Sequence, residues 1–267
     1  MKLGGSTAIV MGASGDIGSA TVRALAAAGA NVVLAAPVSE TAALKMLAAE
    51  AEVRGVRALV VPTDVTVRSD IDRLVRSTLE AFASIDVLAN AAGIGSSPAL
   101  CDDTDEELQR VVEVNLLGSA RMIHAVLPVM KAQRRGAIVN VGSVAGEAGV
   151  MGIYSASKFG LRGLTDTVRR EARSSKIGVT LIEPGFVRSR MNAAMGDGLP
   201  SPDIVARAVV AAVLRPRRCV IVPRYYAVPV AIAKLFPGLV DRVFGDARIQ
   251  QRLNRDARAE RAERVSL

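Results

Sequence analysis

The sequence predicts an α/β fold: a doubly wound parallel sheet of about seven strands, with helices on both faces and a helical extension at the C-terminus. Short aliphatic runs alternate with alanine-rich helical stretches along most of the chain. Half of the 267 residues are hydrophobic, so the chain can bury a large core. A glycine-rich turn follows the first aliphatic run and opens a helix. We expect one large domain over 1–223 and an extension over 224–267.

The expected strands are short runs rich in valine, isoleucine and leucine. They lie at 7–11, 31–35, 58–62, 87–89, 137–141, 179–182 and 219–222. The longer helices expected between them cover about 39–54, 69–82, 104–133 and 152–174. The segment Thr104-Asp105-Glu106-Glu107 is a capping box that opens the longest of these helices. Because ligands of such sheets bind beyond the carboxyl ends of the strands, we expect the functional residues there.

Composition argues against several classes of protein. The formal net charge is +8, but only 3% of the residues are aromatic, so a nucleic-acid-binding face with interleaved aromatic side chains is not expected. Cys101 and Cys219 share no metal-like spacing, so we expect no metal site and a cytoplasmic, reducing setting. The N-terminus does not resemble a signal peptide, and no run of about 18 apolar residues predicts a membrane-spanning helix.

Tyr154 and Lys158 carry the most information about chemistry. Four residues make about one helical turn, so both side chains leave the same face of the expected helix. A phenol has an ordinary pKa of about 10, and an ammonium beside it stabilises the phenolate. The pair can therefore act as an acid–base group near neutral pH. Since the same spacing occurs by chance on many helix surfaces, the interpretation depends on the other motifs.

The turn from Gly12 to Gly18 predicts a dinucleotide site. Glycines at 12, 15 and 18 allow a tight turn, a close approach of the backbone to a pyrophosphate, and tight packing of the helix on the strand. The helix N-terminus supplies amide donors and the positive end of a dipole. A purely structural turn is the alternative, and the position directly after the first strand favours the dinucleotide.

These motifs resemble the short-chain dehydrogenase/reductase family, in its single-domain branch, over about residues 4–223. Five motifs occur in the family's order: the glycine turn, Asp64, Asn90-Ala91-Ala92-Gly93, the Tyr–Lys pair with its partners, and Pro184-Gly185. The resemblance implies a Rossmann-like fold, an NAD(P) cofactor and the interconversion of a secondary alcohol and a ketone.

The resemblance also implies catalytic roles for four residues. Tyr154 would be the general acid–base, and Lys158 would lower its pKa and hold the nicotinamide ribose. Ser143, at the end of the fifth strand, would donate a hydrogen bond to the substrate oxygen. Asn115, in the long helix before that strand, would anchor a water molecule that links Lys158 to solvent.

The implied cofactor contacts fall after the strands. Asp64 would contact the adenine, the segment from Asn90 to Gly93 would line the cofactor and brace the sheet, and the segment from Pro184 to Ser189 would clasp the nicotinamide carboxamide. The full set of implied cofactor-binding residues is Gly12, Ser14, Gly15, Ile17, Gly18, Asp64, Val65, Asn90, Ala91, Gly93, Tyr154, Lys158, Pro184, Gly185, Val187 and Ser189.

The chain departs from the family's pattern at three places. Asp16 stands where the single-domain branch usually has glycine, and we expect its carboxylate to turn away from the pyrophosphate. Ala91 replaces a second asparagine. Ser143 and Tyr154 are 11 residues apart, a shorter separation than is usual in the family, so the loop between them is expected to reshape the pocket without removing the serine.

The end of the second strand bears on the choice of cofactor. It reads Ala35-Ala36-Pro37-Val38-Ser39, with neither an acidic residue nor an arginine. A carboxylate there would bind the ribose hydroxyls and select NAD. Its absence removes the repulsion against a 2′-phosphate, so we expect NADP in preference to NAD.

An apolar stripe at helical spacing marks the C-terminal extension. It comprises Ile232, Leu235, Phe236, Leu239, Val240, Val243 and Phe244, interrupted by Pro237-Gly238. Three interpretations stay open: a flap over an apolar substrate pocket, a packing or oligomer surface, and an interfacial membrane helix. The charged tail over 246–267 predicts a solvated helix or disorder.

We therefore expect a homo-oligomeric, NAD(P)-dependent oxidoreductase for a small-molecule alcohol or ketone. Met191, Met195 and Leu199 favour an apolar substrate, although ordinary core packing explains them equally well. One alternative is a reductase of 3-oxoacyl thioesters. Another is a cofactor-binding sensor or scaffold without catalysis, against which the presence of all four catalytic residue types argues.

Overall fold

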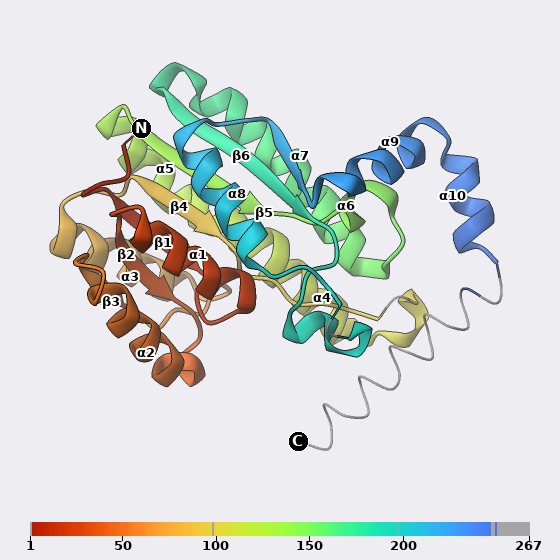
Figure 1. Cartoon of the computed structure of the whole chain (residues 1–267), viewed down its shortest axis with the longest axis horizontal. Helices are drawn as coiled ribbons and strands as arrows, with labels where there is room; N and C mark the ends of the chain where they lie inside the picture. Colours follow the sequence, from red (N-terminus) through yellow and green to blue (C-terminus); the bar gives the residue numbers. More distant parts are fainter. Residues whose placement is uncertain (1, 98, 197, 247–248, 250–267) are drawn as a thin grey trace.

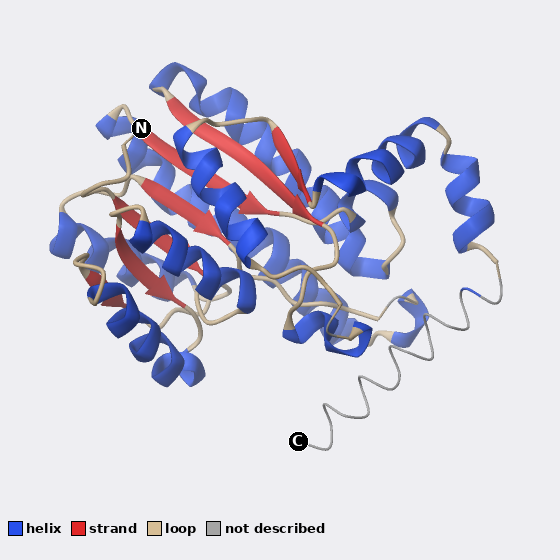
Figure 2. Ribbon diagram, viewed as in Figure 1, coloured by secondary structure: helices blue, strands red, loops and turns tan. Residues whose placement is uncertain are grey.

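The computed structural model describes residues 2–97, 99–196, 198–246 and 249 (Figure 1). A seven-stranded sheet, all parallel, crosses the molecule in the order β3-β2-β1-β4-β5-β6-β7, with helices on both faces (Figure 2). The strands are β1 (Thr7–Met11), β2 (Asn31–Ala35), β3 (Ala58–Val60), β4 (Val87–Asn90), β5 (Gly136–Val141), β6 (Ile177–Pro184) and β7 (Cys219–Val222). The predicted doubly wound sheet is confirmed.

The helices form two layers around this sheet. They are α1 (Asp16–Ala27), α2 (Thr41–Glu52), α3 (Arg68–Phe82), α4 (Asp105–Val112), α5 (Ser119–Gln133), α6 (Ala145–Ala148), α7 (Gly152–Ala172), α8 (Asp203–Leu214), α9 (Ala227–Leu235) and α10 (Pro237–Phe244). Helices α1, α2 and α8 pack on one face, and α3, α5 and α7 on the other.

Side-chain alternation along the strands produces the two cores. In β1, Ala8 and Val10 join the core under α1, α2 and α8, whereas Ile9 and Met11 join the core under α3, α5 and α7. All four side chains are buried, as expected for a parallel strand covered on both faces. The chain runs outward from β1 to β3 and then returns to β4 beside β1. The carboxyl ends of β1 and β4 therefore form the switch point at which such folds bind ligands.

The helix expected over 104–133 is present as a continuous helical segment, but it contains a wider turn that the sequence did not predict. The capping box at Thr104 and Glu107 is present and opens α4. A π-helical turn, η3 (Glu113–Gly118), separates α4 from α5. At Gly118 a Cβ atom would lie 2.7 Å from a methyl carbon of Val65, so glycine lets this turn pack closely on the loop after β3. Wider turns of this kind are frequent at functional sites.

The apolar stripe of the extension does not lie on one continuous helix. After β7 the chain forms the short turn η6 (Arg224–Tyr226), then α9, and it bends at Phe236 before α10. Helix α9 contacts α6, and α10 stands farther from the sheet, at the right in Figure 1. Within the described ranges, no helix is both long and apolar enough to cross a membrane. Most of the charged tail expected over 246–267 lies outside the described residues.

Candidate active site

A cavity of about 1040 Å³ opens at the carboxyl edge of the sheet. The glycine turn before α1, the ends of β4, β5 and β6, the start of α7 and the helices α9 and α10 all contribute to its walls. Of the residues expected to be functional, those that line it are Gly15, Ile17, Gly18, Ala91, Gly93, Ser143, Tyr154, Lys158, Pro184, Gly185, Val187 and Ser189. The fold thus gathers segments that lie far apart in the sequence around one space.

Tyr154 and Lys158 lie in the first two turns of α7 and both are buried, with 8% and 4% of their surface exposed. The ammonium of Lys158 donates a hydrogen bond to the carbonyl oxygen of Val141, at the end of β5, over 3.1 Å. It lies 5.6 Å from the centroid of the Tyr154 ring. The Ser143 side chain, just beyond β5, is hydrogen-bonded to Tyr154. The short loop between Ser143 and Tyr154 has therefore kept the serine at the site.

Burial shifts the pKa of both groups. It raises the pKa of Tyr154 above its ordinary value, and the hydrogen bond from Ser143 offsets only part of that rise. Burial also lowers the pKa of Lys158 to about 8. The lowering of the phenol pKa by Lys158 that the resemblance implies is not seen in this structure, where burial is the larger cause and the Ser143 hydrogen bond is the opposing one. Tyr154 thus keeps its proton at neutral pH, because the ordinary pKa of a phenol is about 10 and burial raises it further.

Asn115 lies in the π-helical turn, fully buried behind the cavity. Its side-chain amide exchanges two hydrogen bonds with the backbone of Ile94: Oδ1 accepts from the amide over 2.8 Å, and Nδ2 donates to the carbonyl over 2.9 Å. Nδ2 also donates to Ser157 Oγ, on α7 between Tyr154 and Lys158. Asn115 therefore fixes the loop after β4 against the helix that carries the tyrosine and lysine.

The glycine turn fits the backbone of a dinucleotide. A Cβ at Gly12 would lie 2.6 Å from the Ala92 nitrogen, and one at Gly18 would lie 1.9 Å from the Gly12 oxygen, so neither position accepts a side chain. A Cβ at Gly15 would meet nothing closer than 3.4 Å, and this residue borders the cavity. The turn therefore leaves its backbone and the N-terminus of α1 open to an anionic ligand.

Asp16 is the first residue of α1, and its carboxylate is directed toward the segment after β6. Oδ2 accepts a hydrogen bond from the Arg190 backbone amide over 2.8 Å, and Arg190 Nη2 donates to the Ser14 carbonyl oxygen over 3.1 Å. The acid that replaces the family's usual glycine thus connects the glycine turn to a segment that covers the cavity.

Six residues expected at the site stand back from the cavity wall: Gly12, Ser14, Asp64, Val65, Asn90 and Asn115. Asp64 Oδ1 accepts hydrogen bonds from the backbone amide and the hydroxyl of Thr66, which shapes the loop before α3. Asn90 Nδ2 donates to Asn140 Oδ1 over 2.9 Å, between paired positions of β4 and β5. These residues support the edge on which the site is built.

Tyr226 is a site residue that the sequence analysis missed. It follows β7 in η6, lines the cavity, and accepts a long hydrogen bond from the Phe186 amide over 3.4 Å. A Cβ at Gly185 would lie 2.2 Å from its ring, so the tyrosine packs directly on the glycine. No sequence pattern links positions 185 and 226, and only the folded chain brings them together.

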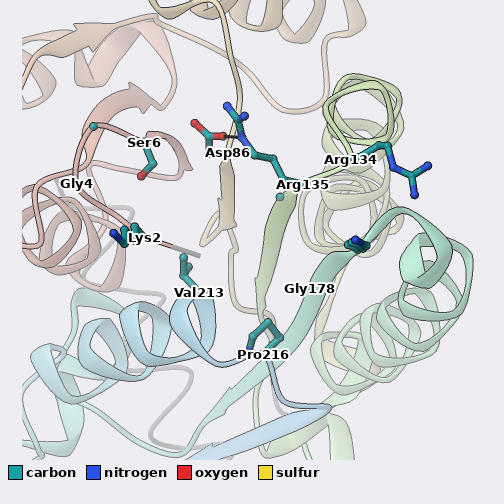
Figure 3. A pocket seen from close by; sticks show the side chains of 12 residues that line it. Lys2, Gly4, Ser6, Asp86, Arg134, Arg135, Gly178, Val213 and Pro216 are labelled. Atoms are coloured by element: carbon teal, nitrogen blue, oxygen red, sulfur yellow. Dashed lines mark hydrogen bonds and ion pairs between the residues drawn. The ribbon is translucent and has the colours of Figure 1, made fainter.

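A second cavity, of about 660 Å³, lies at the amino ends of the strands (Figure 3). Its one described carboxylate, Asp86, already accepts hydrogen bonds from the Thr7 amide, from Ser84 Oγ and from Arg135 Nε. Figure 3 shows the contact between Asp86 and Arg135, which lies just before β5. Because Asp86 holds strand ends together, and because parallel sheets bind ligands at the opposite edge, we place the active site at the carboxyl edge.

Comparison with known proteins agrees with this geometry. A family model described as short chain dehydrogenase matches residues 6–199. A 3-oxoacyl-[acyl-carrier-protein] reductase of Synechocystis sp. is 40% identical over 186 residues, which cover 69% of this chain and 75% of the relative. The chain belongs to the short-chain dehydrogenase/reductase family. It is therefore an oxidoreductase that acts on CH–OH groups, and family membership implies an NAD(P) cofactor and a small-molecule carbonyl or alcohol substrate.

Two further matches extend over more of the chain. The ketoacyl reductase HetN of Nostoc sp. is 32% identical over 257 residues, covering 91% of this chain and 89% of the relative. Among solved structures, levodione reductase superposes with a TM-score of 0.75 at 25% identity, over 82% of this chain and 96% of that one. The fold match supports the Rossmann-like assignment of the sheet.

Proposed function

We propose that the protein reduces the 3-oxo group of an acyl thioester to a hydroxyl, with NADPH as hydride donor. One observation carries this proposal. The buried phenol of Tyr154 is hydrogen-bonded to Ser143, and it lines a cavity whose far wall is apolar. The names of the Synechocystis and Nostoc relatives favour a ketoacyl substrate over the simple secondary alcohol or ketone expected from the motifs alone.

The residues at the carboxyl edge fit the cofactor. The glycine turn and the N-terminus of α1 would bind the pyrophosphate, the loops after β3 and β4 would hold the adenosine half, and the Pro184–Ser189 segment would hold the nicotinamide. When bound, the cofactor supplies a hydride to the carbonyl carbon, and the protein supplies position and electrostatics. This assignment of cofactor contacts follows the family's motifs.

The chain's own side chains would handle the carbonyl oxygen. Ser143 Oγ would donate a hydrogen bond to that oxygen and orient it. Tyr154 would transfer its phenolic proton to the same oxygen as negative charge develops there. Lys158, protonated at neutral pH with its pKa near 8, would hold the ribose and stabilise the phenolate left after the transfer. Asn115 would hold the loop after β4 in place against the start of α7. It would also anchor a water molecule through which a proton returns from solvent.

Replacement of Tyr154 tests the proposal. Tyr154→Phe removes the proton donor without changing the ring, so kcat for acetoacetyl-CoA should fall by roughly 10² to 10⁴. Tyr225→Phe, at an exposed tyrosine outside the cavity lining, is the matched control and should leave kcat unchanged. The measurement is NADPH oxidation followed by absorbance, with product identified by mass spectrometry.

Two results would reject this function. Equal rates in Tyr154→Phe and the unmodified protein would remove the acid–base role. Binding of NADPH without turnover of any 3-oxoacyl thioester, diketone or steroid would favour the non-catalytic sensor or scaffold.

The preference for NADP is tested at the end of β2. Pro37 is exposed there, and no carboxylate lies between Ala35 and Ser39. Pro37→Asp should weaken NADPH binding by about tenfold through repulsion of the 2′-phosphate, and Pro37→Asn is the uncharged control. Fluorescence titration with NADPH and NADH measures both affinities. Tighter binding of NADH than of NADPH by the unmodified protein would overturn the preference.

The proposal includes a cytoplasmic homo-oligomer. Leu117, before α5, and Phe159, on α7, are exposed apolar side chains on the two long helical segments expected to pair. Light scattering coupled to gel filtration gives the mass in solution, and a monomeric mass would contradict this part. We also propose the division into a catalytic domain over 1–223 and an extension over 224–267.

A further inference from the structure

The cavity has an apolar end that the catalytic groups do not use. On one side of it lie Val150 and Met151, in the loop between α6 and α7. On the other side lie Ile232, Leu239 and Val243, from α9 and α10. These walls are hydrocarbon, and they are continuous with the space in front of Tyr154. A ligand that places a carbonyl at Tyr154 therefore extends along an apolar surface.

We propose that α9 and α10 form a binding site for the acyl chain, so that the enzyme selects medium- and long-chain 3-oxoacyl thioesters over short ones. This inference rests on the proposed function. The helices α9 and α10 lie beyond residues 6–199, the part of the chain that the family model matches. The chain-length preference would thus be a property of this extension.

The extension is anchored to the elements that carry the chemistry. Tyr226 packs its ring on Gly185, directly after β6. Lys234 of α9 forms an ion pair with Glu147 of α6, the short helix that follows Ser143. Glu147 is buried and also pairs with Arg162 of α7. The Tyr226–Gly185 contact and the Lys234–Glu147 ion pair hold the apolar wall at a fixed position relative to Ser143 and Tyr154. A site that selects substrates by chain length requires such a fixed position.

The direction of the stripe residues favours an acyl chain over a membrane or a second protein copy. Five of the seven line the cavity: Ile232, Leu239, Val240, Val243 and Phe244. The remaining two, Leu235 and Phe236, are 73% and 61% exposed, and they sit at the bend between the helices. The five residues lie on the wall of the space that opens in front of Tyr154, so an acyl chain extending from Tyr154 would cover side chains that are otherwise partly exposed.

Chain length should change the rate in a graded way. Burial of one methylene group strengthens binding by at most about fourfold. Across acetoacetyl-CoA, 3-oxohexanoyl-CoA, 3-oxooctanoyl-CoA and 3-oxododecanoyl-CoA, kcat/KM should rise by a factor on the order of 10 or more before it levels off.

A matched pair of leucines tests the position of the site. Leu239→Gln changes the cavity wall, and Leu235→Gln makes the same change on the exposed side of the extension. The ratio of kcat/KM for 3-oxododecanoyl-CoA to that for acetoacetyl-CoA should fall about tenfold in Leu239→Gln and stay unchanged in Leu235→Gln. Val243→Thr, which keeps the shape of the side chain, provides a second wall variant if Leu239→Gln fails to fold.

Binding without turnover separates this inference from the proposed function. Dodecanoyl-CoA lacks the 3-oxo group, and calorimetry should show that it binds more tightly than butanoyl-CoA, with the difference reduced in Leu239→Gln. That result supports the subsite even if no 3-oxoacyl thioester is reduced. Reduction of all chain lengths at equal kcat/KM would overturn the inference and leave the proposed function intact. Equal effects of Leu239→Gln and Leu235→Gln would overturn it in favour of an outer interface.

Discussion

The two ends of the active-site cavity are built in different ways. At the catalytic end, Tyr154, Lys158 and Asn115 are buried, and each is held by hydrogen bonds to neighbouring loops or strands. At the apolar end, Leu239 and Val243 remain 49% and 42% exposed, and their helices are anchored through Tyr226 and Lys234. The groups proposed to transfer protons are thus buried and held at the edge of the sheet, whereas the surface proposed to select the substrate lies at the periphery and is partly exposed.

The largest effect is expected when the buried positive charge is removed from the catalytic end. Lys158→Met should lower kcat by roughly 10²-fold or more, because the phenolate formed after proton transfer loses its stabilising cation. Lys131→Met, at a partly exposed lysine of α5 that pairs with Glu171, is the matched control and should retain full activity. Steady-state kinetics with acetoacetyl-CoA measures both. Retained activity in Lys158→Met would show that the buried lysine is only structural.

The same variant should also change the free energy of unfolding. Burial lowers the pKa of Lys158 from 10.5 to about 8, so below pH 8 the folded protein carries a buried charge that the unfolded chain keeps in water. Lys158→Met should therefore raise the free energy of unfolding by about 1–3 kcal/mol near neutral pH. The gain should shrink as the pH rises from about 8 toward 10.5, where the lysine is neutral in both states.

Urea unfolding across this pH range measures that gain. A constant difference between the two proteins, or a destabilised variant, would contradict the burial argument.

The smallest effect is expected at the apolar end. Lys234→Met removes the ion pair with Glu147, which keeps Arg162 as a partner, so the overall fold should persist. A partly exposed pair contributes little, and kcat/KM for 3-oxododecanoyl-CoA should fall by about two- to fivefold as α9 loosens. Arg242→Met, at an exposed arginine of α10, is the charge-matched control. Limited proteolysis should cut the extension faster in Lys234→Met, and equal cleavage rates in both variants would reject the anchoring role.

Local sequence signals predicted much of the fold. The aliphatic runs and their spacing identified seven strands, and the capping box at Thr104 placed the start of α4. The π-helical turn at Asn115 was missed, because no local pattern marks it; its Gly118 packs closely on Val65, which is distant in sequence. In the sequence, the only sign of the bend at Phe236 is that Pro237-Gly238 interrupts the apolar stripe.

The strands, the glycine turn and the common helix face of Tyr154 and Lys158 could be predicted from the sequence, because each depends on residues within one strand, turn or helix. Only the folded chain raises the pKa of Tyr154 by burial and places Tyr226 on Gly185. It also directs the stripe of α9 and α10 toward the cavity. The physical reason is that burial and packing depend on which distant segments meet, and no local pattern encodes that meeting.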